Sequence, residues 1–399
     1  MKTKTLFVIV ATASLFCTAV NLAVGQTWFP IASNQDWTCI ASSADGVKIV
    51  AGTQFAPIYR STDSGATWIA TSTPSNVWTS IACSADGSVL VAMTTQGQDG
   101  LIYRSTNSGV DWIPTSAPGT PNGWISVACS ADGRVVVAMT QPGGIYRSLD
   151  SGATWAVISA PNTKSWTSVA CSADGTRFAA TSDNFGLVHE FFVPGAIYFS
   201  SDSGETWSEA GGTVATNWFS IACSADGKKM IAAGGSLFFS AFLSKDSGAT
   251  WTNTGVPGSS VASSADGTSL AVAGWPGLIY FSRDSGATWT ATSADSRSWG
   301  FVASSADGNA WLALDAYNGL IYKSRSTPVP LLDIALMDGN HVLSWIVPSM
   351  GFALQQNSDL STTNWKDVTI TPILNLTNLQ NQVMLSPTNS NGFYRLATP

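Results

Sequence analysis

Short apolar runs alternate with small polar turns along most of the chain. After Trp78, a β-rich run ends at Ser84, and a turn follows at residues 85–88. A second run covers residues 89–94, and a third reaches residue 105 after a variable loop. A fourth run begins near Trp112. This order predicts one antiparallel meander of four short strands per unit, which we term A to D in chain order.

This unit occurs seven times in all, at the spacing of roughly 40–50 residues that is typical of propeller blades. Each turn between strands A and B reads Ala-Asp-Gly, with aspartates at Asp45, Asp86, Asp132, Asp174, Asp226, Asp266 and Asp307. The seventh unit lacks a fourth strand, whereas Gly25-Gln26-Thr27-Trp28 matches the start of one. The sequence therefore predicts an all-β, seven-bladed propeller over residues 26–326, closed by its N-terminal strand. Six blades plus a degenerate unit are the alternative.

A second motif, Ser-x-Asp-x-Gly-x-Thr-Trp, recurs between strands C and D. Its turn chemistry is clear: the aspartate accepts backbone N–H groups, the glycine takes a positive φ and the tryptophan packs on the sheet. The motif resembles the Asp-box, or BNR repeat, of sialidases, some xyloglucanases, sortilin-like receptors and photosystem II assembly factors. This resemblance implies an architectural turn remote from the ligand site. The residues at its aspartate position are Asp63, Asn107, Asp150, Asp202, Asp246 and Asp284.

Both ends of the chain lie outside the repeats. Residues 1–25 have the basic start and apolar stretch of a signal peptide, with cleavage predicted before Gln26, so we expect a secreted or periplasmic protein. A proline-containing linker at 327–330 precedes residues 331–399, whose alternating runs predict a small antiparallel β-sandwich-like domain. That domain resembles a module appended to many secreted bacterial proteins, which implies attachment, sorting or binding. We expect no membrane span in the mature chain.

Composition narrows the classes of function. The formal net charge is −7, which disfavours nucleic acid as a partner. The chain has 2 histidines, far apart, so zinc sites and Ser-His-Asp catalysis lack their usual parts. We expect no metal, no cofactor and a monomer. Four cysteines share one strand-A position in successive units, where buried small side chains are favoured over disulfides: Cys83, Cys129, Cys171 and Cys223.

Variation between units is confined to the B–C and D–A loops, which a meander places on one face. Diverse loops on a rigid scaffold are the usual place for binding. Aromatic and amide side chains suit sugars, so we expect a non-catalytic protein that binds a glycan or extracellular polymer. Tryptophans of strand A are expected to pack between blades. The predicted contacts are Phe55, Gln96, Gln141, Phe185, His189, Trp275, Arg297 and Tyr317.

Two other classes of function remain open. A glycoside hydrolase needs two carboxylates around the scissile bond, and the loop-face candidates are Asp36, Asp315, Asp183 and Glu190. By resemblance, a xyloglucanase-like activity is favoured over an exo-sialidase-like one, because sialidases use three arginines and only Arg297 is suitably placed here. The other class is a protein-assembly or adhesion scaffold with a protein partner, by resemblance to the photosystem assembly factors.

Overall fold

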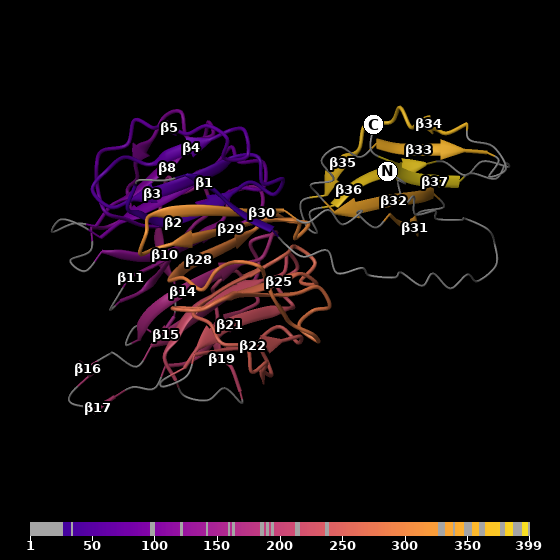
Figure 1. The fold of residues 1–399 in the computed structure, drawn as a ribbon. Coiled ribbons are helices and arrows are strands. Elements are labelled where there is room, and N and C mark those ends of the chain that lie inside the picture. The colour runs from indigo at the N-terminus through magenta and orange to yellow at the C-terminus, as the bar shows by residue number, and fades with distance from the viewer. Residues whose placement is uncertain are drawn as a thin grey trace.

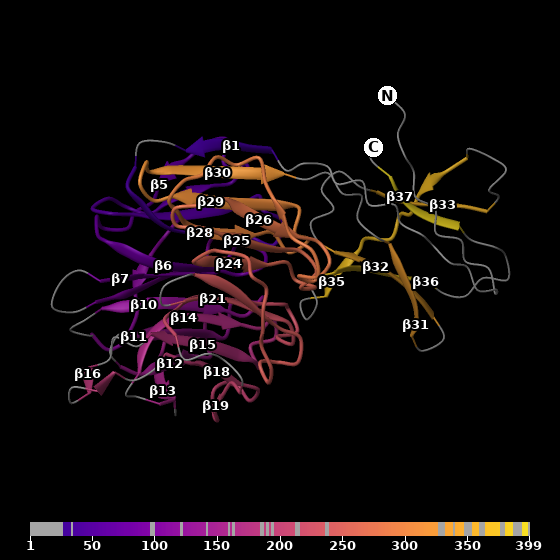
Figure 2. The same ribbon diagram turned by 60° about the horizontal axis from the view of Figure 1, so that its bottom comes forward.

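The structure is a computed structural model. It describes residues 27–32, 35–95, 100–119, 123–140, 143–158, 160–161, 164–183, 187–188, 191–192, 195–211, 216–235, 239–325, 332–337, 340–346, 353–358, 364–375, 380–385 and 393–397. Seven four-stranded antiparallel sheets form a ring and are followed by smaller sheets (Figure 1, Figure 2). The predicted all-β, seven-bladed propeller is therefore confirmed. The predicted signal peptide and the linker at 327–330 lie outside the described residues.

Each blade is a meander whose strands run outward in chain order. The innermost strands are β2 (Trp37–Ser42), β6 (Trp78–Cys83), β10 (Trp124–Cys129), β14 (Ser165–Cys171), β20 (Trp218–Cys223), β24 (Ser260–Ser263) and β28 (Trp299–Ser304). The second strands are β3 (Ile49–Thr53), β7 (Leu90–Thr94), β11 (Val136–Thr140), β15 (Phe178–Asp183), β21 (Met230–Gly234), β25 (Leu270–Ala273) and β29 (Ala310–Asp315). The third strands are β4 (Tyr59–Ser61), β8 (Ile102–Ser105), β12 (Ile145–Ser148), β18 (Ile197–Ser200), β22 (Ser240–Ser244), β26 (Ile279–Ser282) and β30 (Leu320–Arg325). The outer strands are β5 (Ile69–Ala70), β9 (Ile113–Pro114), β13 (Ala156–Ile158), β19 (Ser208–Glu209), β23 (Thr252–Asn253), β27 (Thr290–Ala291) and, in the seventh blade, β1 (Thr27–Ala32).

The N-terminal strand completes the seventh blade, as predicted. β1 pairs antiparallel with β30, and Trp28 lies opposite Ser324. The sheet order from the axis outward is β28, β29, β30 and β1. Because the first and last strands of the propeller share a sheet, hydrogen bonds within one blade close the ring.

Apolar side chains pack between neighbouring blades. One cluster joins Val91 and Met93 of β7 to Trp124 of β10 and Val136 of β11. The second strands β7 and β11 are buried at every position, as expected for sheets covered on both sides. The predicted packing of the strand-A tryptophans is confirmed, because five of them are 0% exposed: Trp78, Trp124, Trp166, Trp218 and Trp299.

Some of these indoles also bind the B–C loop of the preceding blade. Three Nε1–H groups donate to loop carbonyls at 3.0–3.1 Å, from Trp78 to Ala56, from Trp124 to Gly100 and from Trp166 to Gly143. By contrast, the Nε1 atoms of Trp37, Trp218 and Trp299 are buried and have no hydrogen-bond partner within the described ranges. A buried donor without a partner is unfavourable by about 1–3 kcal/mol. The B–C loops before these three tryptophans, in blades seven, four and six, therefore lack the acceptor that the loops of the first three blades provide, as far as the structure describes them.

The A–B turns form a second closed set of contacts between blades. The alanine N–H of each Ala-Asp-Gly turn donates to the alanine carbonyl of the next blade, with N···O distances of 2.6–2.9 Å. The alanines are Ala44, Ala85, Ala131, Ala173, Ala225, Ala265 and Ala306, and the last donates to the first. The turn sequence is repeated because every turn presents the same donor and acceptor to its neighbours.

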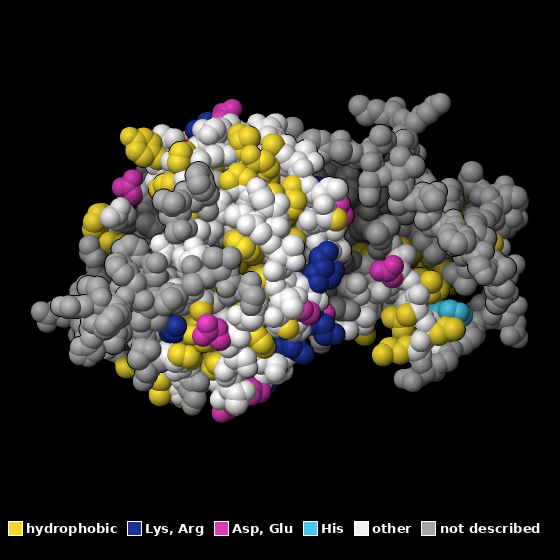
Figure 3. Space-filling model, turned by 90° about the horizontal axis from the view of Figure 1, so that it is seen from below, with side chains coloured by type: hydrophobic (Ala, Val, Ile, Leu, Met, Phe, Trp, Pro, Cys, Tyr) yellow, Lys and Arg dark blue, Asp and Glu magenta, His cyan; other side chains and the backbone are white. Residues whose placement is uncertain are grey.

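The C-terminal residues form two antiparallel sheets around a core that includes Leu343, Trp345 and Leu354. The first sheet contains β31 (Asp333–Met337), β32 (Asn340–Ile346), β36 (Gln380–Leu385) and β35 (Ile373–Asn375). The second contains β34 (Lys366–Asp367), β33 (Ala353–Asn357) and β37 (Phe393–Ala397). Hydrophobic side chains are also visible on the surface of this module (Figure 3). In the part of the chain that the structure describes, no helix has the length and apolar character needed to cross a membrane.

Two small features were not predicted. A hairpin of β16 (Leu187–Val188) and β17 (Phe191–Phe192) lies in the B–C loop of the fourth blade, and β35 lies in the C-terminal module. Strands of two or three residues are too short to show the alternation that identifies longer ones.

The indole contacts generate a prediction for stability. Trp124 and Trp299 are both fully buried, and both pack edge-on against a tyrosine, at centroid distances of 5.0 and 5.3 Å. Trp124→Phe removes a hydrogen bond as well as ring volume, whereas Trp299→Phe removes a donor that has no partner. The free energy of unfolding should therefore fall by about 1 kcal/mol more for Trp124→Phe, measured by urea denaturation. Equal losses, or a larger loss for Trp299→Phe, would contradict this account.

Candidate ligand-binding face

The meander separates turns from loops onto two faces of the ring. The A–B turns and Asp-boxes lie at one end of the blades, and the B–C and D–A loops lie at the other. Figures 1 and 2 show the β16–β17 hairpin, which belongs to the loop face, at the end of the propeller away from the C-terminal module. β30 ends at Arg325 on the box face, so the chain leaves the propeller opposite the variable loops.

Each Asp-box is a closed turn whose polar groups bind one another. In the first box, Asp63 accepts the backbone N–H of Thr67 at 2.8 Å and its hydroxyl at 2.5 Å. Ser61 Oγ accepts the Gly65 N–H at 2.8 Å, and Ser64 has a φ of 62°. Donation by the Thr67 hydroxyl and N–H lowers the pKa of Asp63 to about 2. The equivalent backbone bonds recur at Asn107, Asp150, Asp202, Asp246 and Asp284.

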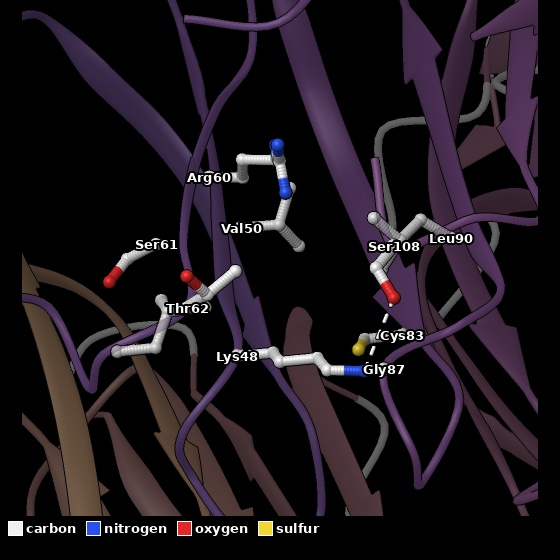
Figure 4. A pocket seen from close by; sticks show the side chains of 10 residues that line it. Lys48, Val50, Arg60, Ser61, Thr62, Cys83, Gly87, Leu90 and Ser108 are labelled. Carbon is white, nitrogen blue, oxygen red and sulfur yellow. Dashed lines mark hydrogen bonds between the residues drawn. The ribbon is translucent and has the colours of Figure 1, made fainter. Parts of the chain in front are cut away.

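A shallow pocket on the box face lies between the first two blades (Figure 4). Its volume is about 10 Å³, roughly enough for one water molecule. Lys48 extends along it and donates from Nζ to Asp86 O at 2.8 Å and to Ser108 Oγ at 3.2 Å. Lys229 makes the equivalent two contacts between the fifth and sixth blades. This lysine position therefore connects neighbouring blades.

The loop face carries the predicted contacts that the structure describes. Phe55, Trp275 and Tyr317 are 61%, 47% and 84% exposed and lie in the B–C loops of the first, sixth and seventh blades. These three blades are neighbours in the closed ring. The remaining predicted residues of the B–C loops, Gln96, Gln141, Phe185 and His189, lie outside the described residues, as does the candidate acid Glu190.

Phe55 has an unusual backbone conformation. Its φ is 68°, and among the described residues it is the one non-glycine position with a positive φ outside the box serines. The Phe55 N–H donates to Asn76 O at 2.9 Å, which holds the loop in this shape. A left-handed conformation is unfavourable for a bulky residue by about 1–2 kcal/mol. The loop nevertheless keeps it, and it exposes the ring on the loop face.

The Trp275 ring of the sixth blade lies next to Gly300 of the seventh blade, a residue without a side chain. A Cβ at Gly300 would lie 3.3 Å from Cζ3 of Trp275 and 3.1 Å from Cβ of Ala316. The other six units have a side chain at the equivalent position, at Thr38, Thr79, Ile125, Thr167, Phe219 and Ser259. Gly300 thus makes room for the indole beside the loop that carries Tyr317.

Phe301 is an exposed aromatic residue of this face that was not predicted. It is 43% exposed and occupies a position at which five other blades have serine. Each of those serines accepts the backbone N–H of the next innermost strand, as Ser80 does from Val127 at 3.2 Å. The sequence could have identified Phe301, because an alignment of the seven units shows phenylalanine where five other units have serine.

Asp315 and Arg297 bind each other. The Asp315 side chain is 0% exposed, and its Oδ2 lies 3.2 Å from Arg297 Nη1. The same carboxylate accepts the N–H groups of Tyr317 at 3.2 Å and Asn318 at 3.3 Å, and the Asn318 Nδ2–H at 2.7 Å. Arg297 Nη2 lies 3.2 Å from Asp295. Asp315 ends β29, and its carboxylate caps the following turn.

The other described acid candidates are separated in the ring. Asp36 is exposed in the loop that enters the first blade, close to the Tyr317 loop, since a Cβ at Gly319 would lie 3.9 Å from its nitrogen. Asp183 ends β15 in the fourth blade. Over the described ranges, no three His, Cys, Asp or Glu residues are placed to bind a metal ion. The described cysteines are free, and burial raises the pKa of Cys129 and Cys223 to about 12.

Comparison with known proteins agrees with the fold. No protein-family model matches the sequence, and no curated protein matches it. Among solved structures, the GH74 xyloglucanase from Xanthomonas campestris has a TM-score of 0.57 and 17% identity, over 80% of this chain and 59% of that one. The chain thus spans less than two thirds of that enzyme. YCF48 bound to a D1 peptide has a TM-score of 0.57 and 15% identity, over 77% of this chain and 99% of that one.

A second YCF48 structure, from Cyanidioschyzon merolae, has a TM-score of 0.55 and 14% identity, over 75% of this chain and 98% of that one. At such identities, the similarity shows the fold alone. The chain is structurally similar to Asp-box propellers, among which are both a glycoside hydrolase and a protein seen with a bound peptide.

The box geometry predicts a dependence of stability on pH. The pKa of Asp63 is depressed in the folded state, so its stabilising contribution is present above pH ~4 and is lost as the pH falls towards 2. Thr67→Val removes the first of the donors that depress this pKa. It should raise the Asp63 pKa, measured by NMR titration, and acid unfolding should begin at a higher pH. Thr62→Val, an exposed change in the same box, is the control and should alter neither.

The backbone of Phe55 predicts an unusual order of variants. Glycine accepts a positive φ, whereas alanine retains the strain. Phe55→Gly should therefore have a free energy of unfolding about 1 kcal/mol higher than Phe55→Ala, measured by urea denaturation. If alanine is as stable as glycine at this position, the left-handed conformation is not a source of strain.

Proposed function

We propose that this protein binds a neutral glycan, or another neutral extracellular polymer, through the loop face of its sixth, seventh and first blades. One observation carries the proposal. The B–C loops of blades six and seven both expose an aromatic ring, Trp275 and Tyr317. The same loops leave the buried indoles of Trp299 and Trp37, like that of Trp218 elsewhere in the ring, without the hydrogen bond made after the first three blades. Natural proteins depart from their own structural rules chiefly at functional sites.

The exposed side chains suit a flat, partly apolar ligand. Trp275, Tyr317, Phe301 and Phe55 come from neighbouring blades of one face and are each at least 43% exposed. Aromatic rings offer large apolar surfaces, and indole and phenol groups add a polar edge. A sugar ring matches this combination, because one face of it is lined by C–H groups and its edge by hydroxyls.

The charges on the face favour a neutral ligand. Arg297 is paired with Asp295 and Asp315, and Lys164 lies 5.5 Å from the Tyr198 ring. Asp36 and Asp295 are exposed. An anionic sugar would meet these carboxylates, whereas the arginine that anions prefer already has two acidic partners. Sialic acids and other acidic glycans are therefore disfavoured.

Binding without hydrolysis fits the carboxylates. Glycosidases place two carboxyl groups on either side of the scissile bond. Asp315 is buried and occupied by hydrogen bonds, which leaves Asp36 as the exposed candidate near the Tyr317 loop. We therefore propose a secreted binding protein. Its loop face stays accessible, because the chain leaves the propeller for the C-terminal module from the opposite face.

An array of neutral and acidic polysaccharides, probed with the full chain and scored for both retention and released sugar, tests this proposal. We expect retention of neutral polymers without release. Trp275→Ala and Tyr317→Ala should each weaken binding about tenfold, the loss of roughly 1.4 kcal/mol of stacking. Leu149→Ala removes a side chain that is 55% exposed on the box face and is the matched control.

Other outcomes would replace the proposal. Sugar release that is abolished by Asp36→Asn would establish a hydrolase. Preference for acidic polymers would contradict the argument from charge. Absence of retention would favour a protein partner and the scaffold alternative.

A further inference from the structure

We infer that Arg297 and Asp315 are positioning residues, which join the Trp275 loop and the Tyr317 loop into one rigid surface, so that a single ligand contacts both aromatic rings. The identity of the ligand rests on the proposed function. The mechanical part, in which two loops from different blades are held together, can be tested without any ligand.

The backbone of Arg297 is attached to the Trp275 loop. Its N–H donates to Gly277 O at 3.0 Å, and its carbonyl accepts the Gly277 N–H at 2.9 Å. Two residues later, the N–H of Trp299 donates to Gly274 O at 3.2 Å. Both ends of the Gly274–Gly277 turn are thus bonded to the segment that carries Arg297.

The side chain of Arg297 crosses to the seventh blade. Its guanidinium lies 5.1 Å from the centre of the Tyr322 ring, and Nη1 lies 3.2 Å from the buried carboxylate of Asp315. A charge pair whose acid is fully buried is strongly destabilised when one partner is removed, unlike an exposed pair. Arg297 therefore links one loop through its backbone to the next through its side chain.

Asp315 determines the shape of the Tyr317 loop. Oδ1 accepts the N–H groups of both Tyr317 and Asn318, and Oδ2 accepts the Asn318 side chain. The preceding N–H, of Ala316, donates to Ser298 O at 3.0 Å, next to Arg297 in the chain. Tyr317 is thus presented, 84% exposed, by a turn that closes on one carboxylate.

The two loops also meet over Gly300. Trp275 and Ala316 both lie within 3.3 Å of the position that a Cβ there would take. An ordered Ala316 therefore limits the movement of the indole. Two aromatic rings held in a fixed relation lose little freedom on binding, which favours a ligand long enough to span both.

Hydrogen exchange tests the mechanical part. The amides of Tyr317 and Asn318 should exchange about tenfold faster in Asp315→Ala than in the wild type, and Asp315→Asn should lie between them because its oxygen still accepts. Arg297→Met should also speed exchange in the Trp275 loop. Unchanged exchange at the Tyr317 and Asn318 amides in Asp315→Ala would overturn the inference, whatever the ligand.

A double-mutant cycle tests the link to binding. Asp315→Asn should weaken retention of the polysaccharide about tenfold in the wild type, and have little further effect in a Tyr317→Ala background. An equal loss in both backgrounds would show that Asp315 does not act through Tyr317, and would overturn the inference. Arg297→Met should also weaken retention of the polysaccharide. Arg297→Lys keeps the charge but cannot contact Asp295 and Asp315 through two separate nitrogen atoms, so it should restore part of that retention.

Gly300→Ala provides a variant that removes no polar contact. Its added methyl group would meet both Trp275 and Ala316, and should weaken retention about as much as Trp275→Ala. Unchanged retention would show that the two loops do not share a surface. If Trp275→Ala and Tyr317→Ala both leave retention intact, the proposed function fails at this face. The ligand part of the inference then fails with it. The hydrogen-exchange experiment still decides whether Arg297 and Asp315 hold the two loops together.

Discussion

Closure of the ring is the constraint on which the rest of the structure depends. The clearest evidence of it is the circle of hydrogen bonds between the A–B turns. Each alanine N–H binds the carbonyl of the next turn, and the seventh returns to Ala44. No bond of this kind can form correctly unless every blade has the same tilt and the same inner end. The near identity of the Ala-Asp-Gly turns follows, because one altered turn would disturb both of its neighbours. The pairing of β1 with β30 also closes the ring, at the outer edge of the seventh blade.

A face committed to closure cannot also vary, so diversity is restricted to the opposite end of the blades. There the structure departs from its own pattern most often where blades six, seven and one adjoin. Two of the three strand-A indoles without an acceptor lie in these blades, one glycine replaces a side chain and one phenylalanine replaces a serine that bridges blades elsewhere. Each departure is unfavourable, or at least removes a favourable contact, and each adjoins an exposed aromatic residue.

The fold does not decide between binding and catalysis. Structures as different in role as a xyloglucanase and a peptide-bound YCF48 share this architecture with the chain at 17% and 15% identity. The difference lies in what the loops carry. Here the Asp315 carboxylate is occupied in shaping its own loop, and Arg297 in joining two loops, so residues that resemble catalytic or anion-binding groups in the sequence act as internal supports in the structure. The aromatic rings that they hold are then the chemically available groups.

The sequence by itself determined the number of blades, the order of their strands, the closure by the N-terminal strand that contains Trp28 and the separation of constant turns from variable loops. These properties are local and repeated, so each unit supports the prediction made from the others. Only the tertiary structure decided which loop residues are free to bind. The buried Asp315 is paired with Arg297 of the preceding interblade loop, and the Trp275 ring lies beside Gly300 of the next blade. Such contacts join residues of different units, and the pattern of one chain does not state which side chains will meet when the ring closes.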